Sequence, residues 1–433
     1  MNTKRLFVFL LTTVLMLAVG CSDKVDNARS AEKGTAVIDP NHPVYFNYER
    51  QGSFYYPMFA ESEDAYYFST GQGSGFFYYF DKETETYGAL CNKPECGHDS
   101  LECNAFVGDS YSGLFYNNHY LFWIGLKEIS PNEYGYVLWS MNLETLERSV
   151  VREFNYENYQ EFLPRQVFIH KGMVYIYCVQ PTIEDGIPHT KVILAAASAL
   201  GTDNITALFE KEYEAGVSGT ANLQNECIYI EVNGAWTEEE MGSYADDNDP
   251  PMHYFYEFYK YSIDSGESLA LFTRDQNVEE MLVQDFSVVG DKIFFANMGE
   301  PGKPGILFCL EDGNVTEAFE FSSDTGPAEN DAVYSAVFIG TGAVYATSKV
   351  DVDHYLCWIV NFDGETLYKG EIPLNYLQAH SGEFLRRAIT FIECNEDSLI
   401  LRFGRTTGDH ANCATDRTVL RSKTDAERSE RTL

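Results

Sequence analysis

The sequence predicts an all-β protein, a β-propeller of about seven four-stranded blades preceded by a signal peptide and a flexible tether. The chain contains 30 Tyr and 30 Phe among 433 residues, and aromatic side chains favour the pleated, half-buried surface of a strand. Long aliphatic amphipathic helices are scarce. One strand-rich unit also recurs along the chain, and regular repetition of short strands is typical of propellers.

The first residues are typical of an export signal. Lys4 and Arg5 precede an apolar run over residues 6–19, which is too short for a comfortable membrane span. The run ends in A-V-G-C, which resembles the cleavage site of a bacterial lipoprotein. We therefore expect a lipoprotein signal peptide over residues 1–20 and lipid attachment at Cys21. An ordinary secretory signal, cleaved elsewhere, is the alternative.

The segment after the signal is expected to tether the domain to a membrane. Residues 21–45 are polar and lack an apolar period, so we expect a lipidated cysteine and a flexible tether there, with the propeller over residues 46–433. Two or three lipid chains hold a protein on a membrane. The sequence thus predicts a location at the cell membrane, lipid-anchored, on the extracytoplasmic side.

The charge of the chain bounds its partners. The formal net charge is −36, and so acidic a surface repels phosphate backbones. We therefore expect no nucleic-acid partner. Cations, basic peptides and neutral glycans are compatible with this surface.

The repeating unit carries an apolar pair on its second strand. The pairs are Tyr67-Phe68, Leu121-Phe122, Val174-Tyr175, Ile228-Tyr229, Ile293-Phe294, Val344-Tyr345 and Leu399-Ile400. Their second members are 51–55 residues apart except for one interval of 65, which indicates an insertion in the fourth unit. The third unit is the weakest, because V-I-L-A-A-A-S-A-L has the composition of a short helix. Six or eight blades, or two β-sandwiches, are the alternatives, but an even repeat without a central linker favours one propeller.

The order of strands within a blade predicts where each loop lies. If strands are counted outward from the axis, loops from second to third strands share one face with the connections between blades. Residues 91–112 are expected to connect the first two blades, and residues 374–388 to form a short helix on a later connection. Long second-to-third loops are expected between Tyr229 and Phe258 and in the seventh unit. All these elaborations are predicted to share one face.

The densest chemistry lies in C-N-K-P-E-C-G-H-D-S-L-E-C-N-A, residues 91–105, which we call the Cys loop. Its candidate metal ligands are Cys91, Cys96, His98 and Cys103. Three thiolates and one imidazole form a complete tetrahedral zinc set, which implies a structural zinc or another soft metal. Cys96 and His98 can bind one ion only if the chain turns sharply between them. A disulfide among the three cysteines, or an unpaired loop, is the alternative, and the haem-attachment spacing C-x-x-C-H is absent.

A tethered, aromatic-rich propeller with L-C-N-K-P-E-C-G-H-…-C-N-A after its first blade resembles a family of surface lipoproteins from Gram-positive anaerobic bacteria. The resemblance covers the lipoprotein cleavage site A-V-G-C, the Cys loop and the repeat, and so most of the chain. The loop motif is its specific part, whereas the blade pattern is generic. The resemblance implies the architecture and the lipid-anchored location, and it implies no activity.

Four other cysteines lie inside apolar, strand-like runs. They are Cys178, Cys227, Cys309 and Cys357. A free thiol in such a run often acts as a small buried hydrophobic group. We expect most of them to be unpaired.

Weaker candidates for a ligand site lie in the long loops. Asp246, Asp247 and Asp249 of the fourth unit could bind calcium, although EF-hand spacing is absent and a solvated acidic loop is the simpler interpretation. Nearby side chains could form a platform for a sugar or a peptide, or could pack between blades; they are Trp236, Tyr244, His253, Tyr254 and Tyr256. His410 of the seventh unit is a further candidate for ligand binding, although a flexible polar loop is the simpler interpretation there.

The sequence favours a binding or scaffold module, with a protein or glycan ligand, over an enzyme. It contains no G-x-S-x-G, H-E-x-x-H or P-loop motif, and no catalytic residue is assigned. The alternatives are a glycan-active enzyme on the loop-rich face and an envelope-assembly or sensor component. Carboxylates clustered near the central channel favour the enzyme, whereas a broad aromatic or apolar patch favours partner binding.

Overall fold

The computed structural model divides the chain into Met1–Val37 and Ile38–Leu433, and every residue that it describes lies in the second unit. The described residues are 38–39, 59–69, 75–84, 86–98, 102–108, 110–130, 133–154, 164–184, 187–201, 204–214, 216–224, 226–237, 252–273, 281–297, 303–322, 334, 336–340, 342–349, 355–371, 387–394, 398–405 and 415–421. Every regular secondary-structure element assigned among them is a β-strand. A helix that could cross a membrane is therefore absent from this part of the chain.

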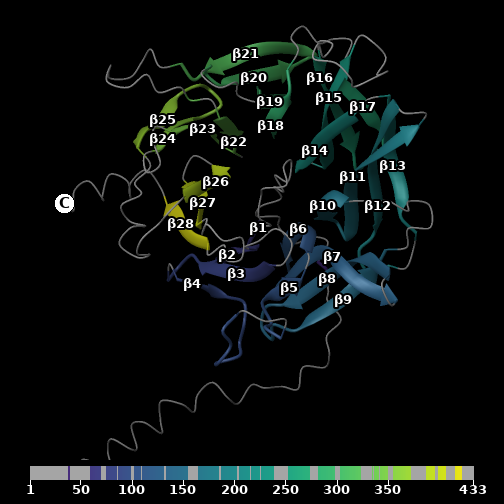
Figure 1. The fold of residues 1–433 in the computed structure, drawn as a ribbon, viewed down its shortest axis with the longest axis vertical. Coiled ribbons are helices and arrows are strands. Elements are labelled where there is room, and N and C mark those ends of the chain that lie inside the picture. Colours follow the sequence, from purple (N-terminus) through teal and green to yellow (C-terminus); the bar gives the residue numbers. More distant parts are fainter. Residues whose placement is uncertain are drawn as a thin grey trace, which may run out of the picture. The chain divides into compact units, whose positions relative to one another are not determined.

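The described strands form seven antiparallel sheets, which are the blades of a β-propeller (Figure 1). Blade 1 contains β1 (Phe59–Glu61), β2 (Ala65–Ser69), β3 (Gly75–Asp81), β4 (Tyr87–Ala89) and β5 (Phe106–Gly108), and blade 2 contains β6 (Ser110–Asn117), β7 (Tyr120–Ser130), β8 (Glu133–Asn142) and β9 (Arg148–Glu153). Blade 3 contains β10 (Pro164–His170), β11 (Met173–Glu184), β12 (Ile187–Ser198) and β13 (Thr206–Tyr213), and blade 4 contains β14 (Gly216–Gln224), β15 (Cys227–Thr237), β16 (Met252–Ser262) and β17 (Ser268–Phe272). Blade 5 contains β18 (Val283–Val289), β19 (Lys292–Asn297), β20 (Ile306–Glu311) and β21 (Asn314–Glu320). Blade 6 contains β22 (Ala336–Ile339), β23 (Val344–Lys349), β24 (Tyr355–Val360) and β25 (Thr366–Glu371), and blade 7 contains β26 (Arg387–Cys394), β27 (Ser398–Arg405) and β28 (Thr415–Arg421).

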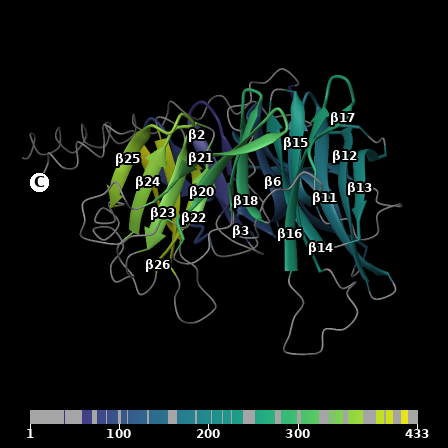
Figure 2. The ribbon, with the colours of Figure 1, turned by 90° about the horizontal axis from the view of Figure 1, so that it is seen from above.

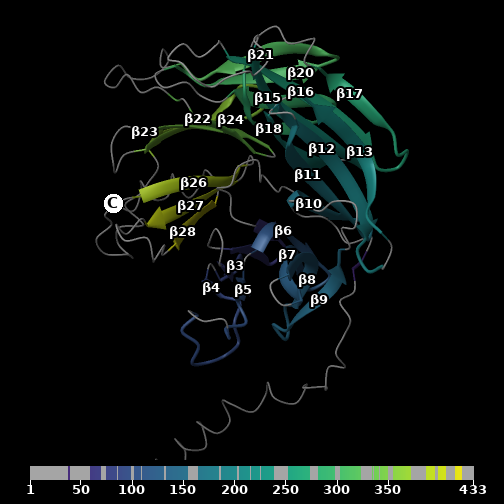
Figure 3. The same ribbon diagram turned by 45° about the vertical axis from the view of Figure 1, so that its right-hand side comes forward.

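The first strand of each blade lies innermost. β1 contacts β6, β6 contacts β10 and β10 contacts β14, and further round the ring β18 contacts β22 and β22 contacts β26. Later strands follow outward as a meander, because each pairs antiparallel with the next one in the sequence. Figures 1 and 3 both show the β26–β28 sheet between blade 6 and blade 1.

The predicted all-β propeller is confirmed, with differences of detail. Six blades carry the four-strand meander, and blade 7 has three strands among the described residues. The Ala-rich segment of the third unit is a strand, not a short helix: it lies in β12, pairs with β11 and β13, and is buried from Val192 to Ala197. Tertiary burial here overrides the helix propensity of alanine. Most of the helix expected over residues 374–388 falls outside the described residues, and its last two residues begin β26.

Aromatic side chains fill the interface between neighbouring blades. Tyr256 of blade 4 lies 5.3 Å from Phe295 of blade 5 and stacks on Phe272 of its own blade at 5.1 Å, while Phe258 of blade 4 lies 5.5 Å from Phe286 of blade 5. Burying one such side chain stabilises the fold by about 1.5–3 kcal/mol. Tyr256 is therefore a core residue, which removes it from the predicted aromatic platform.

Polar side chains on the inner strands also join consecutive blades. These bridges run from Gln166 to the Ala221 N–H, from Asn222 to the Phe286 carbonyl at 2.9 Å, and from Asp285 to the Ile339 N–H at 2.9 Å. Asn233 adds a double bridge, because its Nδ2 donates to the Val283 carbonyl at 2.7 Å and its Oδ1 accepts from the Val283 N–H at 2.8 Å. Buried polar groups need such partners, so these bonds specify how one blade docks on the next.

Among the described residues, three neighbouring blades have unusually long second and third strands. The second and third strands of blades 2, 3 and 4 have 10–12 residues, against 5–8 in the other blades. The β11–β12 pairing runs unbroken to Glu184 and Ile187, well past the last partner of β10. We call the three hairpins β7–β8, β11–β12 and β15–β16 the hairpin rim, and Figure 2 shows β11 and β16 reaching past the shorter strands of blades 5 and 6. They end on the predicted loop-rich face.

The prediction that most of the four cysteines in apolar runs are unpaired is confirmed. Cys178, Cys227, Cys309 and Cys357 are buried and carry free thiols. Burial raises the pKa of the Cys357 thiol to about 12, so this thiol is unreactive at neutral pH.

Candidate metal centre

The Cys loop is an excursion from the outermost strand of blade 1. β4 and β5 both pair with β3, one with each half of it. At the base of the loop, the Leu90 N–H donates to the Phe77 carbonyl at 2.9 Å and the Phe77 N–H donates to the Ala105 carbonyl at 2.8 Å. One residue of β3 therefore bonds to both ends of the loop. β4 and β5 act as two halves of one fourth strand, which the loop interrupts.

This position corrects one prediction. The Cys loop was expected on the connection between blades 1 and 2, but that connection is the single residue between β5 and β6. The last strand of the first unit was expected to end at residue 90, because the three residues of β5 are too short to stand out as a strand. The loop thus leaves the outer edge of blade 1, and its position does not mark the loop-rich face.

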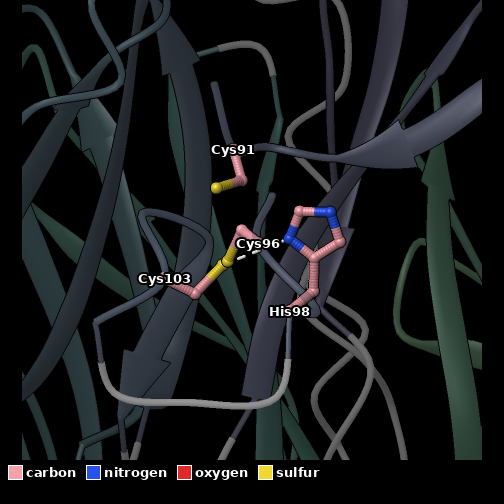
Figure 4. Close-up of side chains that lie close together, drawn as sticks. All are labelled: Cys91, Cys96, His98 and Cys103. Atoms are coloured by element: carbon pink, nitrogen blue, oxygen red, sulfur yellow. Dashed lines mark hydrogen bonds between the residues drawn. The ribbon is translucent and has the colours of Figure 1, made fainter. Parts of the chain in front are cut away.

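The four predicted ligands come together. The three sulfur atoms and a ring nitrogen of Cys91, Cys96, His98 and Cys103 all lie within 4.8 Å of one another (Figure 4). His98 Nδ1 lies 3.4 Å from the Cys103 sulfur. The sharp turn that the spacing requires is present, because His98 has a φ of 55°, in the left-handed region.

The geometry fits a soft metal ion. Tetrahedral coordination with bonds of about 2.3 Å to sulfur puts ligand atoms about 3.8 Å apart, so a small contraction of this cluster would close around an ion. Three sulfurs and one nitrogen fill all four positions and leave none for a substrate. The arrangement can hold a metal ion in a structural role and is not built for metal catalysis.

Backbone N–H groups support the sulfur atoms. Burial opposes ionisation of Cys91, but hydrogen bonds from the backbone of Lys93 and Asn104 and from the two other thiols outweigh it and lower its pKa to about 6. Burial raises the pKa of Cys103 to about 11. The neighbouring thiols add to the rise because they disfavour a second negative charge, and the hydrogen bond from the Ala105 N–H opposes it only in part. One thiol of the cluster therefore ionises readily, and a bound cation would favour ionisation of the others.

The Cys loop also holds blade 2. Asn92 Nδ2 donates to the carbonyl of Thr145, in the turn between β8 and β9, at 3.1 Å, and Asn104 Nδ2 donates to Asn92 Oδ1 at 2.9 Å. Each of these asparagines directly follows a ligand cysteine in the sequence. Cys103 is fully buried, in a cluster shared with Trp123 of blade 2. Neither asparagine was predicted as a site residue, and only their adjacency to the cysteines could have indicated this role.

The weaker ligand candidates are not gathered into a site by the described residues. Trp236 and His253 are backbone partners near the end of the β15–β16 hairpin. Tyr244, Asp246, Asp247, Asp249 and His410 lie outside the described residues. The calcium and platform predictions therefore remain predictions.

Two carboxylates near the inner strands have structural partners. Glu231 of β15 is buried, and its Oε2 accepts the Thr220 N–H at 3.2 Å and the Thr220 hydroxyl at 3.4 Å. Burial raises the pKa of Glu231 well above its usual range, and the bonds from Thr220 offset this only in part. Asp285 Oδ2 accepts a hydrogen bond from the Ile339 N–H at 2.9 Å. These two acids therefore join strands and blades.

Comparisons with known proteins give fold-level likeness alone. No protein-family model matches the chain, and no curated protein matches it. Among solved structures, it is similar to the acylaminoacyl peptidase of Pyrococcus horikoshii, with 11% identity and a TM-score of 0.35, over 87% of this chain and 60% of that one. It is also similar to a prolyl endopeptidase, with 11% identity and a TM-score of 0.43, over 84% and 48% of the two chains, and to the polysaccharide lyase Uly1, with 10% identity and a TM-score of 0.44, over 84% and 89%. This chain thus spans less than two thirds of either peptidase, and likeness at this level carries no argument on activity.

Proposed function

We propose that the protein is a lipid-anchored, extracytoplasmic binding module, in which the propeller presents the hairpin rim to a protein or glycan ligand and the Cys loop binds a structural zinc ion. The observation that carries the binding role is the asymmetry of the propeller. Among the described residues, the second and third strands of three adjacent blades have 10–12 residues, whereas those of the other blades have 5–8. Rigid strands that project from a scaffold hold binding groups in fixed positions.

The hairpin rim has the internal bonds that such a surface needs. The Val217 N–H donates to Thr190 Oγ1 at 3.3 Å, which joins blade 4 to the β12 strand of blade 3. On the outer side, Glu257 Oε2 accepts from Lys211 Nζ at 2.8 Å and from the Tyr213 hydroxyl at 2.6 Å. The first contact fixes the β11–β12 hairpin to β14 of blade 4, and the second fixes the β15–β16 hairpin to β13 of blade 3. Each of these two hairpins is therefore held by the neighbouring blade, which lowers the conformational freedom that ligand binding would cost.

Zinc is proposed because the donor set is soft and closed. Cys3His sets with tetrahedral geometry are typical of structural zinc sites. The purified, reduced protein should take up about one equivalent of zinc, and Cys96→Ser should lose it. Cys227→Ser is the matched control, since it changes a cysteine far from the cluster. Reduced wild-type protein that takes up no zinc overturns the metal site.

Crosslinking on intact cells tests the binding role. Ile183 is 79% exposed near the tip of the β11–β12 hairpin, and Leu269 is 59% exposed on the outer strand β17. A photoreactive amino acid at position 183 should crosslink one recurrent protein or glycan, whereas the same group at position 269 should not. Equal capture at both positions, or capture only at position 269, would contradict a ligand site on the hairpin rim.

A further inference from the structure

We propose that the Cys loop is a site of reversible thiol oxidation: a small disulfide oxidises two of its three cysteines, the metal ion leaves, and the loop releases blade 2. This inference rests on the metal binding proposed above. It concerns the chemical signal to which the site responds, and it gives the proposed binding module a second, oxidised state.

The first observation is the surplus of thiols within reach of one another. Cys91, Cys96 and Cys103 place their sulfur atoms within 4.8 Å of each other, so a sulfur that has been attacked has two neighbours that can complete a disulfide. A disulfide brings two sulfurs to about 2.05 Å, well inside the separation of about 3.8 Å that tetrahedral zinc imposes. The oxidised pair therefore cannot also serve as two ligands of the same ion.

The second observation is access. Cys91 and Cys96 are half-buried, and the residues between them, Asn92 to Glu95, are exposed. Cys103 is fully buried beneath them. A small disulfide can therefore reach Cys91 or Cys96 first, and a neighbouring sulfur then displaces the mixed disulfide. Cys178, Cys227, Cys309 and Cys357 are buried within the blades, so the Cys loop is more accessible to a small disulfide than these four thiols are.

The exchange balances as follows. One zinc-bound cysteinate attacks a sulfur of the small disulfide and releases one small thiolate. A second cysteinate attacks the resulting mixed disulfide, forms the internal S–S bond and releases the other thiolate. The two cysteines lose two electrons and the small disulfide gains them. Both small thiolates and the third cysteine take protons from water as the zinc ion leaves.

The third observation links the cluster to the neighbouring blade. Asn92 follows Cys91, Asn104 follows Cys103, and the two asparagines form the chain of bonds that ends at the Thr145 carbonyl. A change in the positions of the two cysteines therefore shifts the side chains that hold the β8–β9 turn. Blade 3 has an equivalent tie without thiols, because Arg152 donates to the Ser198 carbonyl and to the Gly201 carbonyl at 3.1 Å.

The test uses full-length, zinc-loaded wild-type protein and the small disulfide cystine. A chromogenic chelator should report the release of about one equivalent of zinc, and peptide mass analysis should show a loss of about 2 Da for one internal disulfide within the Cys loop. Cys178 and Cys357 should keep free thiols. Backbone hydrogen exchange over residues 142–148 should rise at least about fivefold, while exchange over residues 198–206 stays unchanged; dithiothreitol with zinc should restore the initial state.

The outcomes separate the two proposals. If the reduced protein takes up no zinc, the metal site itself fails. If it binds zinc but cystine neither releases the ion nor forms an internal disulfide, or if a mixed disulfide with cysteine persists, the metal site stands and the oxidation site is overturned. Release of zinc without faster exchange over residues 142–148 overturns the link to blade 2.

Discussion

The replacement of Asn233 by leucine tests how neighbouring blades are joined. The Asn233 side chain bonds both the carbonyl and the N–H of Val283, at 2.7 Å and 2.8 Å. These groups lie inside the interface of blades 4 and 5, where Asn233 is 8% exposed and Val283 is 4% exposed. Leucine bonds neither group, so the substitution leaves one buried donor and one buried acceptor without a partner.

The expected loss of stability follows from these two unpaired groups. A buried polar group that loses its partner costs about 1–3 kcal/mol, so Asn233→Leu should lower the free energy of unfolding by about 2–6 kcal/mol. Asn222→Leu is the matched control at the same interface. It removes one bond, to the Phe286 carbonyl, and should cost about half as much.

Urea denaturation, followed by tryptophan fluorescence, measures the effect. The midpoints of the variants are compared at equal slope, which ensures that a shift reports stability. A loss under about 1 kcal/mol for Asn233→Leu, or equal losses for the two variants, would refute the idea that unpaired backbone groups set the cost.

Three further predictions concern a buried acid, a close approach and the anchor. Because burial raises the folded-state pKa of Glu231, its contribution to stability is complete below the usual carboxyl pKa and falls by about 1.4 kcal/mol per pH unit as the pH rises toward the folded-state value. Glu231→Gln should remove this component, which is measured as the difference between the two stability–pH curves, and parallel curves would contradict it. Gly219→Ala should lower the free energy of unfolding by about 1–3 kcal/mol in urea denaturation, because its methyl group would lie 2.2 Å from the Glu231 carbonyl oxygen and 2.6 Å from the Tyr177 hydroxyl. Gly216→Ala on the same strand meets nothing within 4 Å and should be nearly neutral. Equal effects of the two substitutions would contradict this prediction. Cys21→Ser should move the protein from the membrane fraction to the soluble fraction, and retention in the membrane would count against the lipid anchor.

The fold was predictable because its signal repeats. The apolar pairs marked the second strand of every blade, and their spacing gave the number of sheets. The Ala-rich part of β12 was ambiguous because composition alone cannot separate a short helix from a central strand that is buried on both faces. The bridges of Asn222, Asn233 and Asp285 could not be predicted, since one polar residue in an apolar strand does not reveal its partner on the next blade.

The candidate site was predictable in composition and not in position. Four candidate ligands, three cysteines and one histidine, within thirteen residues indicated a metal site, and the required turn at His98 is present. The place of the loop depended on β5, which is three residues long and whose pairing with the start of β3 has no sequence signal. The lengths of the hairpins in blades 2 and 3 were also missed, because turn residues such as Pro131-Asn132 and Asp185-Gly186 indicate where a hairpin turns but not how far its two strands stay paired.

The Cys loop lies where blade 1 most needs a clamp. β1 has three residues, and β4 and β5, the two halves of the outermost strand, have three each, so these strands offer little surface to blade 2. Blade 2 is tied to blade 3 by Arg152, and blade 3 to blade 4 by Lys211 and Glu257. Between blades 1 and 2 that role falls to the Cys loop, with Cys103 buried in the shared core and Asn92 bonded to the β8–β9 turn. Removal of the proposed zinc ion should therefore loosen this one junction first, and hydrogen exchange should rise at the β8–β9 turn before it rises in the other blades. A uniform rise in all blades would instead indicate that the ion stabilises the ring as a whole.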